Sequence, residues 1–235
     1  MKTIGLLGGM SWESSIEYYR IINQSVRKEL GGVHSAKIVL VSLDFAEIEE
    51  LQMKGDWKAA TRILIQSAQE LEGAGADFFL ICTNTMHLMA EEISGAVSIP
   101  LLHIADATAR EVKTENLTKV GLLGTRFTME EDFYRGRLSD LHKLQVIIPD
   151  QVGRDLIHQV IYDEWVRGRI HNRSREEYLS VIESLVEKGA EGIILGCTEI
   201  GLLVKGEDIP VPVFDTMEIH AAAAVEAAFS RFPIS

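Results

Sequence analysis

The sequence is short of cysteine, of positive charge and of long apolar runs. It has two cysteines in 235 residues, and a chain of this length buries enough surface to fold without disulfide staples, so we expect both thiols to be reduced. Lysine and arginine number 23 against 35 aspartates and glutamates, which gives a formal charge of -12. Nucleic acids and anionic membranes attract basic surfaces, so we expect neither as a partner.

Signals for export, membrane insertion and metal binding are also missing. The apolar run before the first glycine pair is too short for the core of a signal peptide, and no other run could span a membrane, so we expect a cytoplasmic protein. The seven histidines follow neither the HxxH nor the HExxH spacing. We therefore expect no metal site.

Short apolar segments alternate with amphipathic ones, which is typical of an α/β fold with parallel sheets. Continuous runs such as FFLI and IILG predict strands that are covered on both faces. The expected strands are 3–7, 37–41, 77–81, 101–104, 120–123, 146–148, 192–195 and 211–214. Helical spacing predicts one apolar helix face with Trp57, Ala60, Leu64, Ala68 and Leu71, and another with Ile16, Tyr19, Ile22 or Asn23, Val26 and Leu30.

Three segments recur in the same order in both halves of the chain. TIGLLGGM matches KVGLLGTR 116 residues later, GADFFLICTNT matches GAEGIILGCTEI 114 residues later, and the segment at Pro100 matches that at Pro212. Three collinear matches predict a duplicated unit, hence two similar lobes with a cleft between them. We expect the first lobe to comprise residues 1–104 and 217–235, and the second residues 105–216.

The repeat aligns Thr83 with Cys197, so we expect these residues on opposite walls of the cleft. Ligand sites in parallel α/β units form where strands end and helices begin. A thiol at the start of a helix feels the positive end of the helix dipole, which lowers its pKa, so Cys197 is a candidate base. Side chains alternate along a strand, so Cys82 should point away from the cleft as a packing residue.

The residues after Thr83 and Cys197 have two interpretations. Asn84, Thr85, Thr198 and Glu199 stand at strand-to-helix junctions, where free backbone N–H groups can hold a substrate carboxylate. Helix capping alone would also explain Asn84, Thr85 and Thr198.

The stretches GLLGGM, CTNTMH, GLLGTRFTM and GCTE together resemble the cofactor-independent aspartate/glutamate racemase family, over nearly the whole chain and with most likeness to its enteric-type bacterial members. This resemblance implies a two-lobed pseudosymmetric α/β fold, an amino-acid substrate, no pyridoxal phosphate and no metal. It also implies a homodimer and a C-terminal helix that returns to the first lobe. The family uses two cysteines on opposite faces of the substrate Cα. Here Thr83 replaces the first, and Cys197 matches the second, which faces the α-proton of the L-enantiomer.

The resemblance also maps substrate-binding groups onto Met10, Gln52, Thr125, Thr128 and Glu164. Family members specific for acidic substrates commonly carry a cation in the loop after the second strand, where Gln52 stands, and a neutral amide there argues against strict aspartate and glutamate specificity. Arg126 could replace that cation or be solvated or ion-paired. Glu164 and Glu199 could bind the substrate ammonium group or occupy first turns of helices, where acids are favoured.

We therefore expect Cys197 to remove the α-proton of an L-amino acid, with L-aspartate and L-glutamate first among the substrates. Thr83, directly or through water, would supply a proton to the other face. Two alternatives remain open. One is a single-cysteine decarboxylase of the same superfamily, and the other is a small-molecule-binding protein without catalytic activity.

Overall fold

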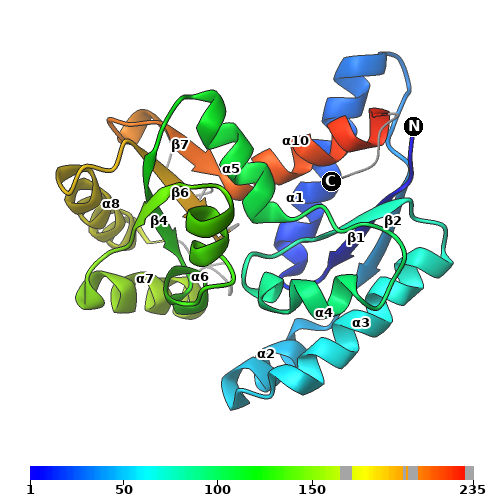
Figure 1. Ribbon diagram of the computed structural model, residues 1–235, viewed down its shortest axis with the longest axis horizontal. Coiled ribbons are helices and arrows are strands. Elements are labelled where there is room, and N and C mark those ends of the chain that lie inside the picture. The colour runs from blue at the N-terminus through cyan, green and yellow to red at the C-terminus, as the bar shows by residue number, and fades with distance from the viewer. Residues whose placement is uncertain (165–170, 198–199, 201–205, 231–235) are drawn as a thin grey trace. The chain divides into compact units, whose positions relative to one another are not determined.

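The computed structural model divides the chain into two compact units (Figure 1). The first comprises residues 1–104 and 220–235, and the second residues 105–219. Each unit is an α/β fold around one parallel sheet, which confirms the predicted fold class. The ranges that the structure describes are 1–164, 171–197, 200 and 206–230. Within these ranges, no helix has the length and apolar character that a membrane span requires.

The first unit packs helices on both faces of a three-stranded sheet. Its elements are β1 (Ile4–Gly8), α1 (Trp12–Leu30), β2 (Ile38–Ser42), α2 (Phe45–Lys54), α3 (Trp57–Gly73), β3 (Phe78–Ile81), the 3-10 helix η1 (Thr85–Met89), α4 (Ala90–Ser94) and most of α10 (Thr216–Phe229). The strand order is β2-β1-β3. Helices α1 and α3 both contact β1, and every residue of β1 and β3 is buried, as the continuous apolar runs predict.

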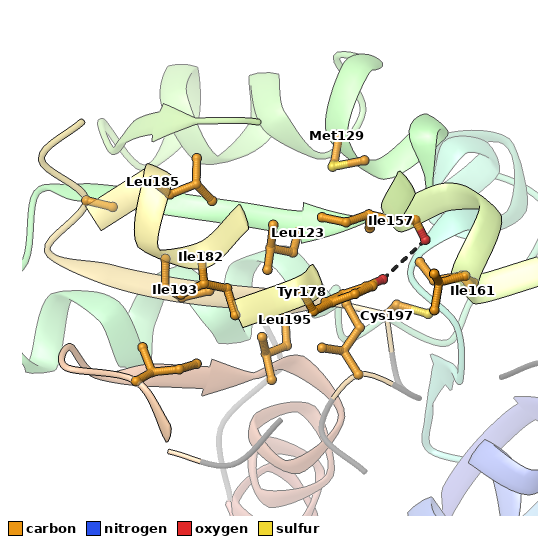
Figure 2. Packing of buried hydrophobic residues seen from close by; sticks show 14 residues of the cluster. Leu123, Met129, Ile157, Ile161, Tyr178, Ile182, Leu185, Ile193, Leu195 and Cys197 are labelled. Atoms are coloured by element: carbon orange, nitrogen blue, oxygen red, sulfur yellow. Dashed lines mark hydrogen bonds between the residues drawn. The ribbon is translucent and has the colours of Figure 1, made fainter. Parts of the chain in front are cut away.

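The second unit has a four-stranded parallel sheet in the order β5-β4-β6-β7. Its elements are α5 (Ile104–Thr114), β4 (Lys119–Gly124), α6 (Arg126–Glu130), the π-helical turn η2 (Arg137–Leu141), β5 (Gln145–Ile147), α7 (Gln151–Asp163), α8 (Asn172–Glu187), β6 (Gly192–Gly196), the 3-10 helix η4 (Gly206–Asp208) and β7 (Val213–Asp215). Helices α6, α7 and α8 contact β4, and the core between the sheet and helices α7 and α8 is shown in Figure 2.

The strand registers reproduce the sequence repeat. Leu7 of β1 lies opposite Ile81 of β3, and Leu123 of β4 lies opposite Leu195 of β6. These two pairs are related by the same offsets, 116 and 114 residues, as the repeated motifs. The residues that follow β3 and β6 are therefore equivalent in the two units, because each sheet aligns its strand ends in the same way.

The predicted strand 101–104 is wrong. Only Leu101 pairs with the sheet, through an isolated bridge to Phe79, and the chain is already helical at Ile104. The backbone N–H of Ile104 donates to Nε2 of His87 at 3.3 Å, so a side chain from η1 holds the start of α5. The pairing ends after this single bridge because the chain turns into the helix.

The apolar face predicted for α1 is also wrong in part. Ile16 and Tyr19 are more than half exposed, whereas Tyr18, Ile22 and Val26 are fully buried. The buried face begins with small serines that pack against the turn after β1, including Ser15. Because of these polar contacts near its start, the helix buries a face that is shifted by one residue from the face predicted by the apolar spacing. The face predicted for α3 is confirmed, since its members from Ala60 to Leu71 are buried.

Candidate functional site

The turn after β1 is built from glycines that let the backbone approach its neighbours. Gly9 has a φ of 88°, and a Cβ there would collide with the backbone of Leu43. Its N–H donates to Oγ of Ser15 at 2.8 Å. Met10 follows this turn and packs into the apolar core with Ile48. Ser15 is not among the predicted site residues, and the sequence signal nearest to it is Ser11, which caps α1 by accepting the N–H of Ser14.

The segment after β3 carries the first predicted catalytic residue. Thr83 is half-buried, whereas Asn84 and Thr85 are buried. Asn84 makes no side-chain capping bond to η1, so capping does not account for it. Cys82 is fully buried, and burial raises the pKa of its thiol far above the usual range. Cys82 is thus a packing residue, as the alternation along the strand predicts.

Cys197 directly follows β6 and packs against the apolar core of the second unit. Figure 2 shows its side chain beside Ile161 and Tyr178, and it is 8% exposed. The Tyr178 hydroxyl donates to the Ile157 carbonyl at 3.2 Å, which fixes helix α7 behind the thiol. The N–H of Ile200 donates to the Cys197 carbonyl at 3.1 Å, as in a first helical turn. The predicted substrate-binding residues Thr198 and Glu199 lie outside the described residues.

Neighbouring glycines fix the backbone that leads to Cys197. Gly124 of β4 lies opposite Gly196 of β6. A Cβ on Gly196 would lie 2.7 Å from the Leu123 carbonyl oxygen, and a Cβ on Gly124 would lie 2.8 Å from the Gly196 carbonyl oxygen. The two strand ends can approach this closely only without side chains at these positions.

Thr125 and Thr128 form the start of helix α6. Oγ1 of Thr125 accepts the N–H of Thr128 at 3.3 Å, and the two hydroxyl oxygens are 3.2 Å apart. Both side chains are buried. Capping therefore explains part of why a threonine stands at position 125. Because Gly124 pairs with Gly196, this helix start and Cys197 leave adjacent strands at the same edge of the sheet.

Arg126 is ion-paired. Its Nη2 is 2.7 Å from Oδ1 of Asp155, and its backbone N–H donates to Nδ1 of His158 at 3.2 Å. Burial, and then repulsion from Arg126, lower the pKa of His158, so this ring remains an acceptor at neutral pH. Of the two interpretations of Arg126, the structure favours the ion pair over a free cation for the substrate.

Gln52 lies in a helix, and its predicted placement in a loop is wrong. Helix α2 begins after Asp44, whose carboxylate accepts the N–H of Ala46 at 3.1 Å, and it ends at Gly55 in the left-handed conformation. These two caps enclose a helix in place of the predicted loop. Gln52 is 5% exposed, so its amide is held inside the first unit.

Glu164 lies at the C-terminal cap of α7, so its placement in a first helical turn is wrong. A carboxylate is unfavourable at this end of a helix dipole. Oγ of Ser174, in the first turn of α8, lies 2.8 and 2.7 Å from the two carboxylate oxygens. This hydrogen bonding offsets the dipole and ties the start of α8 to the end of α7.

The structure brings the predicted residues together in two groups, one in each unit. Because the N–H of Cys82 donates to the Leu7 carbonyl at 2.9 Å, the turn with Met10 and the segment from Thr83 to Thr85 leave adjacent strands. Thr125, Thr128 and Cys197 form the equivalent group in the second unit. In the described part of the chain, no cluster of histidine, cysteine and carboxylate side chains has an arrangement suited to a metal ion.

Most of the chain is similar to known racemases. The family model described as Asp/Glu/Hydantoin racemase matches residues 7–224. The broad specificity amino-acid racemase RacX of Bacillus subtilis (strain 168) is 26% identical over 164 residues, which is 70% of each protein.

Two solved structures resemble the whole chain. A candidate Asp/Glu racemase from Yersinia pestis is 54% identical, with a TM-score of 0.92 over 98% of this chain and 100% of that one. An aspartate racemase homologue from Pyrococcus horikoshii OT3 is 33% identical, with a TM-score of 0.84 over the same shares.

Proposed function

Because this chain belongs to the Asp/Glu/hydantoin racemase family, we propose that it inverts the Cα of L-aspartate and L-glutamate, and of some neutral amino acids, through Cys197 and Thr83. Its membership makes it an amino-acid racemase, an isomerase. One observation carries the residue assignment: the two sheets have equivalent registers, so Thr83 and Cys197 follow equivalent strands. The family resemblance assigns the second of these positions to a cysteine that acts on the L-enantiomer.

The proposed reaction moves one proton off Cα and another onto it. The Cys197 thiolate takes the α-proton of the L-amino acid and becomes a thiol, and the electron pair stays on Cα. The Thr83 hydroxyl, or a water that it holds, gives a proton to the opposite face. A proton then passes from the Cys197 thiol through solvent to the Thr83 oxygen, or to the hydroxide left by the water, which restores the thiolate and the hydroxyl. Threonine is a poor base without an activating neighbour, so we expect a lower kcat with the D-enantiomer than with the L-enantiomer.

We propose that a side-chain carboxylate of the substrate would meet the neutral amide of Gln52 and no free cation from Arg126. Gln52 offers an amide where family members specific for acidic substrates commonly carry a cation, and Arg126 is paired with Asp155. A carboxylate bound by an amide lacks a charge-assisted hydrogen bond. We therefore propose that the site favours a side-chain carboxylate less strongly than a site with a cationic residue would. The proposed substrate-binding residues are Met10, Gln52, Asn84, Thr85, Thr125, Thr128, Glu164, Thr198 and Glu199.

Proton NMR in D₂O tests the assignment, with no cofactor added and with L-aspartate, L-glutamate and neutral L-amino acids as substrates. We expect loss of the α-proton signal together with inversion, measured by chiral chromatography. Cys197→Ala should abolish both, and Cys82→Ala is the matched control, since it removes the other thiol and should keep both. Thr83→Cys should raise activity on the D-enantiomer.

Each other outcome points to a different interpretation. A Cys197→Ala enzyme that exchanges the α-proton at the wild-type rate would overturn the role of Cys197. Exchange without inversion in the wild-type enzyme would overturn the role of Thr83. Stabilisation by amino acids with no exchange at all would favour the binding protein, and turnover of an arylmalonate would favour the decarboxylase.

We propose that the reaction needs neither pyridoxal phosphate nor a metal ion, as the family resemblance implies. Activity should survive dialysis against EDTA and treatment with hydroxylamine, which removes pyridoxal phosphate. Loss of activity that returns on adding either group would contradict this.

We also propose that the chain forms a homodimer. Helix α1 exposes Trp12, Ile16 and Tyr19 at 59, 52 and 53%, and their spacing places them on one face of the helix. A second copy of the chain is the expected cover for this face. Light scattering should give twice the chain mass, and Tyr19→Glu should lower it, whereas a wild-type monomer would refute the proposal.

A further inference from the structure

His87 links the segment that carries Thr83 to the start of helix α5. Its ring is buried, with 2% of the residue exposed. Nδ1 lies 2.8 Å from the Thr83 carbonyl oxygen, and Nε2 lies 3.3 Å from the backbone nitrogen of Ile104. An amide N–H can only donate, so Nε2 accepts, and Nδ1 carries the proton that it donates to the Thr83 carbonyl. Both bonds require the neutral ring in this one tautomer.

The second unit holds the equivalent helix start in a different way. There Oδ1 of Asp215 accepts the N–H groups of Met217 and Glu218, at 2.9 and 3.2 Å, so the residue before α10 caps its own helix. The position equivalent to Asp215 in the first repeat, 112 residues earlier, is His103, which has no carboxylate. In the first unit the N–H of Ile104, the first residue of α5, donates to His87, which lies 17 residues earlier in the chain.

The repeat has a different residue type at the position equivalent to His87. The position that the repeat aligns with His87, 114 residues later, is Gly201, which has no side chain to reach the Cys197 carbonyl. The two halves of the repeat thus differ in sequence at two equivalent positions, the residue that follows the strand and the residue aligned with His87.

Neighbouring side chains hold the His87 ring in place. The His103 ring centroid is 4.5 Å away and the His220 centroid is 6.0 Å away. His220 donates from Nε2 to the Leu102 carbonyl at 2.8 Å and accepts the Tyr18 hydroxyl at Nδ1 at 2.9 Å. Hydrogen bonds therefore hold the backbone at Leu102 and at Ile104, on both sides of His103. The His87 ring packs against this segment while it donates to the Thr83 carbonyl.

We propose that His87 is a positioning residue for the Thr83 half of the reaction. By fixing the Thr83 carbonyl, it sets the direction of the Thr83 side chain and hence the delivery of the proton to the second face of Cα. His87 is buried, so we propose that it acts through Thr83 and makes no contact with the substrate. This inference rests on the proposed function, because it assigns His87 to one of the two proton transfers proposed there.

A defect at His87 should therefore separate the two proton transfers. Cys197 would still remove the α-proton of an L-amino acid, exchange it with solvent and return a deuteron to the same face. The second face would receive its proton more slowly, because a misplacement of about 1 Å can cost about 100-fold in rate. The measured quantity is the ratio of α-deuterium incorporated into recovered L-substrate to inversion, in D₂O.

Two variants divide the bonds of His87 between them. His87→Asn places an amide donor where Nδ1 stands and keeps the bond to Thr83, whereas His87→Gln places an acceptor where Nε2 stands and keeps the bond to Ile104. We expect His87→Gln to raise the exchange-to-inversion ratio about 10-fold or more, and His87→Asn to stay within about 3-fold of the wild type. Tyr18→Phe is the matched control, since it weakens the same buried cluster away from Thr83 and should leave the ratio unchanged.

The outcomes are distinct. A folded His87→Gln enzyme with the wild-type ratio would overturn the proposal, as would equal shifts in His87→Asn and His87→Gln. If His87→Gln does not fold, a His87→Asn ratio that departs from the wild type by 10-fold or more still overturns it. If the wild-type enzyme shows no exchange that depends on Cys197, the proposed function itself fails, and the role of His87 falls with it.

Discussion

Lowering the pH from 7.5 to 5 should destabilise the first unit through His220. This ring is fully buried and makes both of its hydrogen bonds in the neutral form, to the Leu102 carbonyl and the Tyr18 hydroxyl. Burial, followed by repulsion from His87, lowers the pKa of His220 to about 3. The same side chain in the unfolded chain has a pKa near 6.5.

The sign of the effect follows from which state binds the proton. Between pH 6.5 and 3, the unfolded chain carries a proton on His220 and the folded protein does not, so falling pH favours unfolding. The slope is about 1.4 kcal/mol per pH unit. Between pH 7.5 and 5 this group alone should remove about 2 kcal/mol from the free energy of unfolding.

Urea unfolding at the two pH values measures this loss in the wild type and in His220→Gln. Glutamine can keep a donor toward the Leu102 carbonyl, but it does not titrate. The variant should be less stable than the wild type at pH 7.5, because the Tyr18 hydroxyl loses its acceptor, yet it should lose about 2 kcal/mol less on going to pH 5. Tyr18→Phe removes the same bond and keeps the titrating ring, so its loss should follow the wild type. Equal losses in wild type and His220→Gln would refute the reasoning.

Three other perturbations test packing, burial and charge. Gly196→Ala should lower the free energy of unfolding by about 1–3 kcal/mol, because a Cβ would press on the Leu123 carbonyl; an unchanged urea midpoint would contradict this. A thiol reagent at pH 7.5 should leave Cys82 unmodified in the native protein, since burial raises its pKa, and mass spectrometry that found it labelled before unfolding would argue against that burial. Asp106→Asn should cost about 1–3 kcal/mol, because this carboxylate accepts two hydrogen bonds of 2.7 Å from Arg137. A double-mutant cycle with Arg137→Met checks the pairing, which additive losses would rule out.

Local patterns and the repeat were enough to predict most of the fold. Apolar runs predicted the buried strands, and the matched motifs predicted sheets of equivalent register. The strand at 101–104 could not be predicted correctly, because its end depends on a bond between Ile104 and His87. The buried face of α1 depends on polar contacts of Ser15 with the preceding turn, which hydrophobic spacing does not register.

For the candidate site, the sequence predicted which positions follow equivalent strands but not the contacts of their side chains. The repeat aligned Thr83 with Cys197, and the registers make these positions equivalent. The partners of individual side chains were not predictable, since the bond from Ser174 to Glu164 joins residues of different helices. The pairing of Arg126 with Asp155 is likewise set by how α6 packs on α7.

The equivalent registers of the two sheets have a consequence for how such an enzyme can evolve after gene duplication. The strands place the backbone that leads to Thr83 and to Cys197, and the side chains at these two positions take no part in the pairing of the strands. On the proposed mechanism, a substitution at one of these positions would change the group that transfers a proton on one face of Cα while the scaffold is inherited intact. We therefore expect the maximal rates with the two enantiomers and the stability of the fold to be separately selectable, so that laboratory evolution could change one without eroding the other.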